Sequence, residues 1–353
     1  MSAGQDEIAI DETISDDSGS SAYQSGSYVD TSEKDEDNWE NWSLIVNASE
    51  YSTASLSSSI YDYRYENGRR YHAYKDGKYA FPNDEREQNR LDIIHHVYLL
   101  MLDDKLHLAP IGENPQRILD VGTGTGIWAI DMGERYPSAE VVGTDLSPIQ
   151  PSWVPPNVQF QIDDAEVEWT WANDSFDFIH MRHLTGAIQD WPALVKRAYR
   201  CVKPGGYVEF GEYEMDLCSD DGTFHSGLYL WKFYDLVRKA AKKHGREFNV
   251  TARLKGMLED AGFEDITYET FKIPLGTWPA DKKLKEKGAY LLLNAETAAF
   301  DAFGTGLFTR ELEMTLDEAN EIIEGAGRDA RNRKIHSYNV QHLLYARKPL
   351  EDC

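Results

Sequence analysis

Long apolar runs and cysteines are scarce in this sequence, and each shortage excludes a class of protein. No stretch approaches the ~18 uninterrupted apolar residues that a bilayer-spanning helix requires, so we expect no membrane span. The three cysteines, Cys201, Cys218 and Cys353, lie far apart without the spacing of metal ligands. This arrangement argues against a structural zinc site and suits a reducing compartment.

Basic residues are few in the whole chain and almost missing from its start. The formal net charge is −25, and residues 1–50 hold thirteen Asp or Glu against a single Lys. This stretch has too few aliphatic residues to offset the entropy of ordering, so we expect residues 1–50 to form a disordered acidic tail. Such a start is unlike a secretory or transit peptide. We therefore expect a soluble intracellular protein of the cytoplasm, the nucleus or both.

The negative charge also disfavours nucleic acid as a directly bound partner, because it repels the phosphate backbone. The main basic cluster is Arg238, Lys239, Lys242, Lys243 and Arg246. We interpret it as the solvated face of a helix.

Aromatic residues are dense in residues 51–110, which we expect to form an N-terminal segment followed by a helix. Tyr71, His72 and Tyr79 are candidates for a lid over a cofactor, with core packing as the alternative interpretation. Asn83 is a candidate N-cap, since acids follow it in the first helical turn. Apolar residues at helical spacing predict that this helix packs on the main domain. They are Leu91, Ile94, Tyr98 and Met101.

From residue 117 short apolar runs alternate with amphipathic segments, which predicts parallel strands with crossover helices. Strands are expected at 117–121, 140–144, 158–162, 176–181, 207–213, 266–273 and 336–347. Helices are expected at 191–202, 228–244, 251–261, 282–303 and 316–329. We predict one α/β domain over residues 111–353, with a helical insertion at about 275–332 that covers the active site.

The first strand of this domain ends in a glycine-rich loop, Asp120-Val121-Gly122-Thr123-Gly124-Thr125-Gly126. The glycines fall at spacing two and two, whereas the dinucleotide fingerprint needs its third glycine where Ile127 stands. A nicotinamide dehydrogenase is therefore disfavoured. Glycines let the backbone approach a ligand closely, and the helix after the loop presents free N–H groups.

Acids at the tips of the next two strands complete a nucleotide-like pattern. Asp145, followed by Leu146, is placed to accept both hydroxyls of a ribose. Of Asp163 and Asp164, we select Asp164, which precedes Ala165, to accept from an adenine amino group. The combination predicts S-adenosylmethionine as cofactor. Its methionine portion is expected against Gly122, Thr123, Gly124 and Gly126, and its ammonium near Asp120.

The region from Arg117 to Phe210 resembles the class I S-adenosylmethionine-dependent methyltransferase core, including the Lys203-Pro204-Gly205-Gly206 turn typical before its fifth strand. The resemblance implies a Rossmann-like seven-stranded sheet with helices on both faces, plus helical N-terminal and C-terminal lid elements.

Four shorter motifs resemble the fungal LaeA-like methyltransferases, and this likeness covers nearly everything after the tail. They are Tyr65-Glu66-Asn67-Gly68-Arg69-Arg70-Tyr71-His72, Ile179-His180-Met181-Arg182, Asp190-Trp191 and Tyr345-Ala346-Arg347-Lys348-Pro349. Members of that family are associated with velvet-type regulators, with control of secondary metabolism and with development, and others belong to biosynthetic clusters. The resemblance implies a velvet-type regulatory protein as a partner.

Methyl transfer needs a positioned acceptor and, where the acceptor atom is protonated, a base. His183 is the first candidate base, because an imidazole titrates near neutral pH; a surface histidine on a loop is the alternative. Arg182 is a candidate for holding the cofactor carboxylate, unless it pairs with Glu209 or Glu212. Other side chains expected near the strand tips or an acceptor pocket are His180, Tyr213, Trp231, Phe233 and Tyr234.

We therefore predict an S-adenosylmethionine-dependent methyltransferase that acts on a protein or a small natural product, linked to fungal secondary metabolism or its regulation and development. The alternative is a velvet-type regulatory interaction subunit that keeps the fold with little or no turnover. Intact Asp120, Gly122, Gly124, Gly126 and Asp145 favour retained cofactor binding, which both functions permit.

Overall fold

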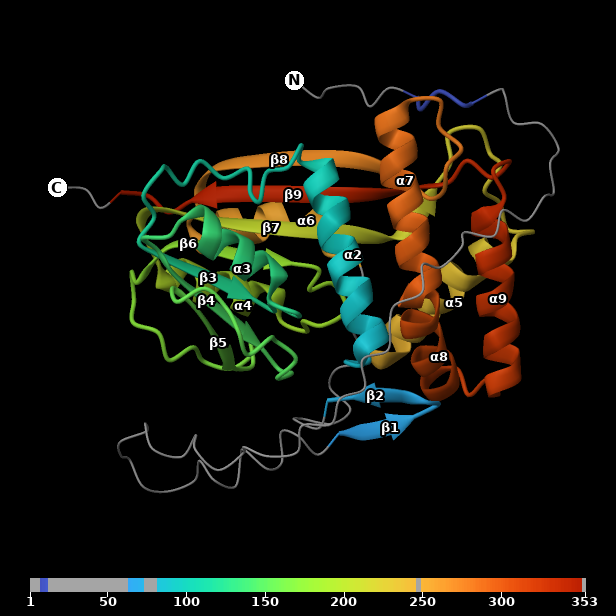
Figure 1. The fold of residues 1–353 in the computed structure, drawn as a ribbon, viewed down its shortest axis with the longest axis horizontal. Helices are drawn as coiled ribbons and strands as arrows, with labels where there is room; N and C mark the ends of the chain where they lie inside the picture. The colour runs from blue at the N-terminus through green and yellow to red at the C-terminus, as the bar shows by residue number, and fades with distance from the viewer. Residues whose placement is uncertain (1–6, 12–62, 73–80, 246–248, 351–353) are drawn as a thin grey trace.

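A central mixed sheet with helices on both faces dominates the computed structural model, which describes residues 7–11, 63–72, 81–245 and 249–350 (Figure 1). A small hairpin, β1 (Arg64–Glu66) and β2 (Arg69–Tyr71), lies apart from this sheet, beyond one end of helix α2 (Glu85–Met101). A second group of helices gathers at one end of the long strands. This arrangement confirms the predicted fold class.

The seven strands of the sheet lie in the order β5-β4-β3-β6-β7-β9-β8. Their bounds are β3 (Arg117–Val121), β4 (Glu140–Asp145), β5 (Val158–Ile162), β6 (Phe176–Arg182), β7 (Val202–Cys218), β8 (Glu264–Pro274) and β9 (Tyr338–Arg347). β9 pairs antiparallel with both of its neighbours, whereas β3 to β7 pair in parallel. The strand order reverses between β3 and β6, where open α/β sheets bind their ligands.

Alternating side chains along the strands bury both faces of the sheet. Ile118 packs with Trp128 of α3 (Ile127–Arg135), whereas the next residue, Leu119, belongs to the core that contains α4 (Trp191–Cys201) and α6 (Thr251–Ala261). Each such fully buried side chain contributes ~1.5–3 kcal/mol through the hydrophobic effect. The strand β3, which ends in the glycine loop, is thereby held between the two layers of helices.

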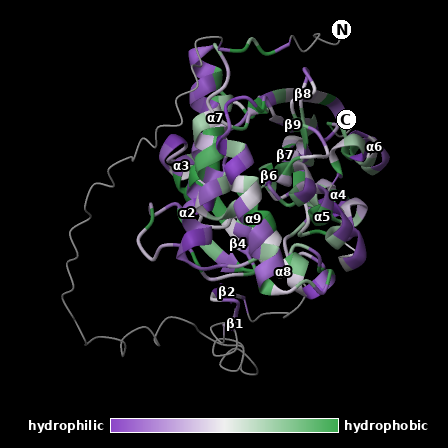
Figure 2. Cartoon of the chain, turned by 90° about the vertical axis from the view of Figure 1, so that its right-hand side faces the viewer, coloured by the Kyte–Doolittle hydropathy of each residue, from purple (hydrophilic) through white to green (hydrophobic). Residues whose placement is uncertain are grey.

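The remaining helices enclose a second core at the far end of β7. They are α5 (Tyr229–His244), α7 (Lys282–Asn294), the π-helical turn η1 (Ala295–Ala299), α8 (Phe300–Glu311) and α9 (Leu316–Arg331). Figure 2 shows apolar residues in the central strands β6 and β7, while the first turns of α7 are hydrophilic. The predicted helix over 282–303 thus continues to Glu311 through a π-helical turn, which no pattern in the sequence predicts.

Two predicted boundaries are wrong for local reasons. The Lys203-Pro204-Gly205-Gly206 segment is a bulge inside β7, because Val202 pairs with Phe176 and Tyr207 already pairs with Phe178. The N-cap of α2 is Asp84, which accepts the N–H of Glu87. Asn83 instead accepts a hydrogen bond from Arg70 and donates one to Ser147.

Residues 7–11, expected within the disordered tail, instead dock on the domain. Ile8 is buried against Trp278 and Tyr338, and Ile10 forms a β-bridge with Pro279. The Asp11 carboxylate pairs with Lys285 and lies 3.5 Å from Arg333. This strap corrects the expectation for five of its residues; the rest of residues 1–50 lie outside the described part of the chain.

We expect the Ile8→Ala substitution to lower the free energy of unfolding by about 1–3 kcal/mol, since it removes a buried aliphatic side chain. Ile10→Ala is the matched control, because Ile10 is 37% exposed. Thermal unfolding of both variants checks this. Equal melting temperatures for Ile8→Ala and the wild type would show that the strap does not dock.

The basic face of α5 is paired with acids, as a solvated helix face predicts. Arg238 contacts Asp216 and Asp235, and Lys239 pairs with Asp235 at 2.6 Å. Arg246 lies outside the described residues. No helix within the described ranges has the length and apolar content to cross a membrane.

Candidate active site

Two pockets adjoin each other at the carboxyl ends of β3, β4 and β6, and a third adjoins them at His183. The strand-tip pocket, with about 880 Å³ of empty space counted out to its mouth, is lined by Gly122, Gly124, Asp145, Leu146, Asp164 and Ala165 among others. The glycine-loop pocket, about 400 Å³, is lined by Asp120, Gly122, Thr123 and Gly124 among others. The structure therefore brings together eight of the nine residues predicted to hold the cofactor.

Two glycines of the loop, Gly122 and Gly124, border both pockets with bare backbone. Gly122 and Gly124 have φ angles of 72° and 58°, in the left-handed region that glycine adopts without strain. A Cβ atom at Gly122 would lie 2.4 Å from Leu184 Cδ2. Only glycine fits there, and the bare backbone faces the pocket.

Gly126 is the predicted cofactor residue that lines neither pocket. It is the N-cap of α3, and a Cβ atom on it would fall 2.3 Å from the Phe160 ring. Its missing side chain leaves room for that ring to pack on the loop. The third glycine of the motif thus supports the packing of the loop and does not contact the cofactor pockets.

Asp145 at the tip of β4 is oriented by two backbone donors. Its Oδ2 accepts the N–H of Gly124 and its Oδ1 the N–H of Ser147, both at 2.9 Å. Burial raises the pKa of Asp145 to about 6, and the nearby charge of Asp120 adds to this effect against the opposing backbone hydrogen bonds. Each carboxylate oxygen keeps a second lone pair for a further donor.

This raised pKa predicts that cofactor affinity falls in acid. An ionised carboxylate accepts hydroxyl protons better than a carboxylic acid, so binding should weaken by up to tenfold for each pH unit below about 6. Asp145→Asn should bind S-adenosylhomocysteine more weakly and lose this dependence, whereas Asp163→Asn should keep it. Calorimetry between pH 5 and 8 measures both, and an equal pH slope in Asp145→Asn would contradict the assignment.

Asp120 is held by a buried polar cluster behind the loop. Its Oδ1 lies 2.7 Å from His180 Nδ1, and its Oδ2 accepts the Thr123 hydroxyl at 2.6 Å. Burial lowers the pKa of His180 to about 4, and its neutral ring stacks 3.7 Å from Trp128. His180 therefore positions Asp120.

At the tip of β5, both Asp163 and Asp164 line the strand-tip pocket. Asp164 is the more buried, and its Oδ1 accepts the N–H of Glu166 at 2.8 Å. Asp163 accepts the N–H of Asp164. The preference for Asp164 as an adenine contact stays a prediction.

Arg182 does not pair with either glutamate considered for it. Glu209 accepts the N–H groups of Leu108 and Ala109, and Glu212 accepts those of Leu184 and Thr185, so both carboxylates are occupied by backbone. Burial raises the pKa of each glutamate to about 7.

The Arg182 guanidinium instead lies over the ring of Tyr98 and contacts His95 Nδ1 at 3.0 Å. Among the described residues no carboxylate forms an ion pair with it. It lines both the strand-tip and glycine-loop pockets. An arginine without an acidic partner there fits the carboxylate of an amino acid.

His183 lies where the three pockets meet. It lines the strand-tip pocket, the glycine-loop pocket and a third one, the helix pocket. Its ring packs between Tyr98 and Tyr213, and its Nε2 is shut off from solvent without a hydrogen-bond partner in the described chain. Burial lowers its pKa well below the usual value, so the ring is neutral at pH 7.

The helix pocket, with about 560 Å³ of empty space counted out to its mouth, lies between the sheet and the second group of helices. Phe233 and Tyr234, two of the aromatic residues considered for an acceptor pocket, line it, together with Tyr213. Trp231 does not. Tyr71 lies instead against Arg310 of α8, as core packing predicts, and Tyr79 lies outside the described residues.

Other lining residues were missed by sequence reasoning. Leu91 and Ile94 have the right signal, apolar positions on one face of α2, but we interpreted it as packing on the main domain. Asn294, Ala295 and Ala299 reach the helix pocket at or beside the η1 turn. No local pattern singles those three out.

Comparison with known proteins decides the family. A family model described as a methyltransferase domain matches residues 78–268 of this chain. The chain belongs to this methyltransferase family. "Methyltransferase pytC" of Aspergillus terreus is 43% identical over 299 residues, which cover 84% of this chain and 92% of that protein.

Two further relatives of the methyltransferase confirm the resemblance to LaeA-like proteins. "Secondary metabolism regulator LAE1" of Cochliobolus heterostrophus is 40% identical over 80% of this chain and 94% of its own. "Protein-methionine methyltransferase laeA" of Emericella nidulans is 34% identical over 84% and 79%. The methyltransferase takes its methyl group from S-adenosylmethionine, as predicted.

The methyltransferase has side chains that suit this cofactor. Gly122 and Gly124 put bare backbone against both pockets, and Arg182 has no acidic partner among the described residues. Asp145 offers acceptor capacity for hydroxyls. The donors and acceptors thus match the polar groups of a nucleoside joined to an amino acid.

Proposed function

We propose that this methyltransferase methylates an acceptor bound in the helix pocket and works in fungal secondary metabolism or its regulation. One observation carries the first part: His183 lines the helix pocket and both pockets of the cofactor site. The relatives named as regulators of secondary metabolism support the second.

Asp120, Thr123, Arg182 and the glycine loop would hold the amino-acid end of the cofactor, and Asp145, Leu146, Asp164 and Ala165 its adenosyl end. When bound, S-adenosylmethionine supplies a methyl group already activated by its sulfonium. The chain then has to orient the acceptor and accept its proton. No nucleophilic side chain is required.

His183 is the base in this proposal. Its neutral ring can accept a hydrogen bond from an acceptor hydroxyl or amine through the otherwise unpartnered Nε2. The backbone there has a φ of 58°, and its N–H donates to the carbonyl of Gly211, which fixes the ring at the tip of β6. Burial lowers the pKa of the ring, which keeps it unprotonated at neutral pH but also makes it a weaker proton acceptor.

We expect His183→Asn to lower kcat by about 10²- to 10⁴-fold, the usual contribution of a positioned base. Asparagine tolerates the left-handed backbone, so the loop should keep its shape. Affinity for S-adenosylhomocysteine should change less than about tenfold. His225→Asn, at an exposed position, is the control.

The assay follows labelled methyl from S-adenosylmethionine into the organic and protein fractions of a fungal extract. Label that depends on His183 supports the proposal. Tight binding of S-adenosylhomocysteine with no label in either fraction would favour the regulatory subunit instead, and a velvet-type partner would then be the first to test. Equal turnover in His183→Asn would remove His183 from the chemistry.

A further inference from the structure

We infer that the acceptor is a compact, uncharged, mainly apolar molecule with a hydroxyl or amine, rather than a segment of a protein. This inference rests on the proposed function and narrows its substrate class. The chemistry of the helix pocket and the contacts that tie its helices together carry it.

The walls of the pocket are mostly aliphatic and aromatic. Phe233 and Phe300 meet edge to face, with ring centroids 5.1 Å apart, and Phe303 lies nearby on α8. Met215 and Leu217 of β7 also line the pocket. Such surroundings favour ring-containing ligands, which gain from edge-to-face contacts as well as from burial.

The lining offers no unpaired charge to a ligand. Its one charged side chain, Arg90, forms a buried two-pronged ion pair with Glu87 at 2.8–3.0 Å. His183 is neutral. A ligand carboxylate or ammonium would therefore lose its hydration without a partner, which is strongly unfavourable.

A few polar atoms remain for recognition. The Asn294 side chain donates from Nδ2 to the carbonyl of Arg90 at 2.8 Å, and its Oδ1 has no hydrogen bond in the described chain. The Tyr234 hydroxyl likewise has no partner there, and burial raises its pKa, so it stays a donor. Asn339 and Gln341 are already bonded to each other. The pocket thus offers two acceptors, His183 Nε2 and Asn294 Oδ1, and one donor, the Tyr234 hydroxyl.

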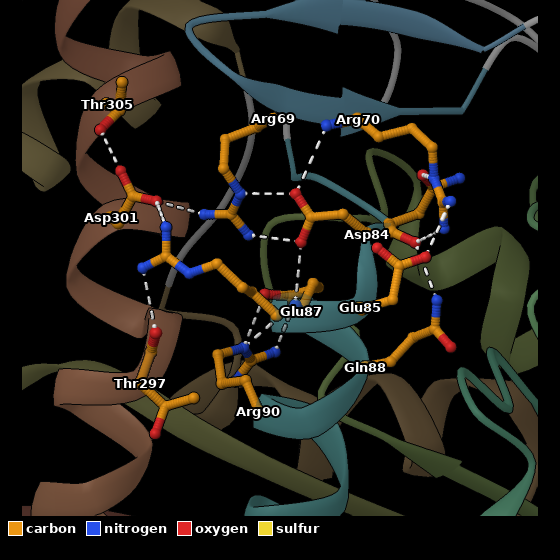
Figure 3. A network of polar contacts seen from close by, with 12 residues as sticks. Arg69, Arg70, Asp84, Glu85, Glu87, Gln88, Arg90, Thr297, Asp301 and Thr305 are labelled. Atoms are coloured by element: carbon orange, nitrogen blue, oxygen red, sulfur yellow. Dashed lines mark hydrogen bonds and ion pairs between the residues drawn. The ribbon is translucent and has the colours of Figure 1, made fainter. Parts of the chain in front are cut away.

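Ion pairs tie the start of α2 to α8, as Figure 3 shows. The Arg69 guanidinium joins Asp84 at the start of α2 to Asp301 of α8. Arg86 reaches from α2 to Asp301 and to the carbonyl of Thr297. The same elements carry the lining residues Arg90, Ala299 and Phe300, so a ligand large enough to widen the pocket would have to strain these contacts.

The test uses the full chain with three probes: 2-naphthol, 2-naphthoate and a blocked Ala-Met-Ala peptide. Calorimetry is run with and without saturating S-adenosylhomocysteine. We expect 2-naphthol to bind the complex at least about tenfold more tightly than 2-naphthoate, and the peptide not to bind. Tyr234→Phe should weaken 2-naphthol about three- to tenfold and leave S-adenosylhomocysteine unaffected, while Tyr207→Phe, away from the pocket, should change neither.

Peptide binding, equal binding of naphthol and naphthoate, or no binding of 2-naphthol to a complex that does bind S-adenosylhomocysteine would each overturn the inference. Those results leave the proposed function standing. Failure of S-adenosylhomocysteine itself to bind would instead remove the proposed function. The two failures are therefore distinguishable.

Discussion

The Gly124→Val substitution is expected to lower the affinity for S-adenosylhomocysteine by about 100-fold or more, equivalent to ~2.7 kcal/mol. Gly124 lines both pockets of the cofactor site, and its N–H orients Asp145. A Cβ atom there would lie 3.2 Å from Leu91 Cδ1, and the two methyl groups of valine would extend further into the site. Space for the ligand and the position of Asp145 would be lost together.

The control for this variant is Gly112→Val. Gly112 also has a positive φ, 76°, but nothing lies within 4 Å of the Cβ position. Both variants carry the ~1–2 kcal/mol cost of a left-handed L-residue, and Gly124→Val adds the close contact with Leu91, so both melting temperatures should fall, that of Gly124→Val by more. Only Gly124→Val should lose the ligand in calorimetry. A folded Gly124→Val protein with unchanged affinity would refute the placement of the cofactor at the loop.

The cofactor side of the site was predictable because its signals are local. Gly122, Asp145 and Asp164 each lie at the end of an apolar strand, and the tips of parallel strands share one edge of a sheet. The hydrophobic periodicity and composition of the strands were therefore enough to predict that these residues lie close together. The same reasoning could not distinguish Asn83 from Asp84 as the N-cap of α2, since both residue types are good caps. The Asn83 side chain is already bonded to Arg70, which is distant in sequence, and Asp84 caps the helix.

The acceptor side was not predictable, because its geometry depends on distant segments. His183 had a surface loop as its alternative interpretation, and Tyr98 and Tyr213, which pack against its ring, come from other elements. Asn294 reaches the helix pocket at the start of a π turn, which adds one residue to a helical turn and rotates the rest of the helix. Arg182 does not pair with Glu209 or Glu212 because backbone N–H groups already donate to both carboxylates, and no local pattern in the sequence shows this.

Replacing Arg69 with alanine is expected to lower the free energy of unfolding by about 3–5 kcal/mol, the usual effect of removing one partner from a buried ion pair. Arg69 is 3% exposed and binds Asp84 through Nε and Nη2 and Asp301 through Nη1 (Figure 3). Its loss removes the cationic partner of the partly buried Asp84, while Asp301 keeps Arg86. The ion pairs of Arg69 that join the β1–β2 hairpin to α2 and α8 would be lost.

The pH dependence of this loss distinguishes charge from packing. Burial alone would raise the pKa of Asp84, but the hydrogen bonds and charge of Arg69 hold it below its usual value. The stabilisation from that ion pair is therefore present above pH ~4 and is lost as pH falls through the lowered pKa. Arg69→Ala should differ most from the wild type near pH 7 and least in strong acid.

Two further variants separate the ion pairs from the packing of the Arg69 stem. Arg69→Met keeps most of the apolar stem, so recovery of the wild-type melting temperature by methionine would mean that packing, not the ion pairs, holds the hairpin. Lys283→Ala removes an exposed pair with Asp103 and should change little, as surface pairs do. Because Asp301 sits beside the η1 turn, Arg69→Ala should also weaken 2-naphthol more than S-adenosylhomocysteine, which links the stability of this clamp to the shape of the helix pocket.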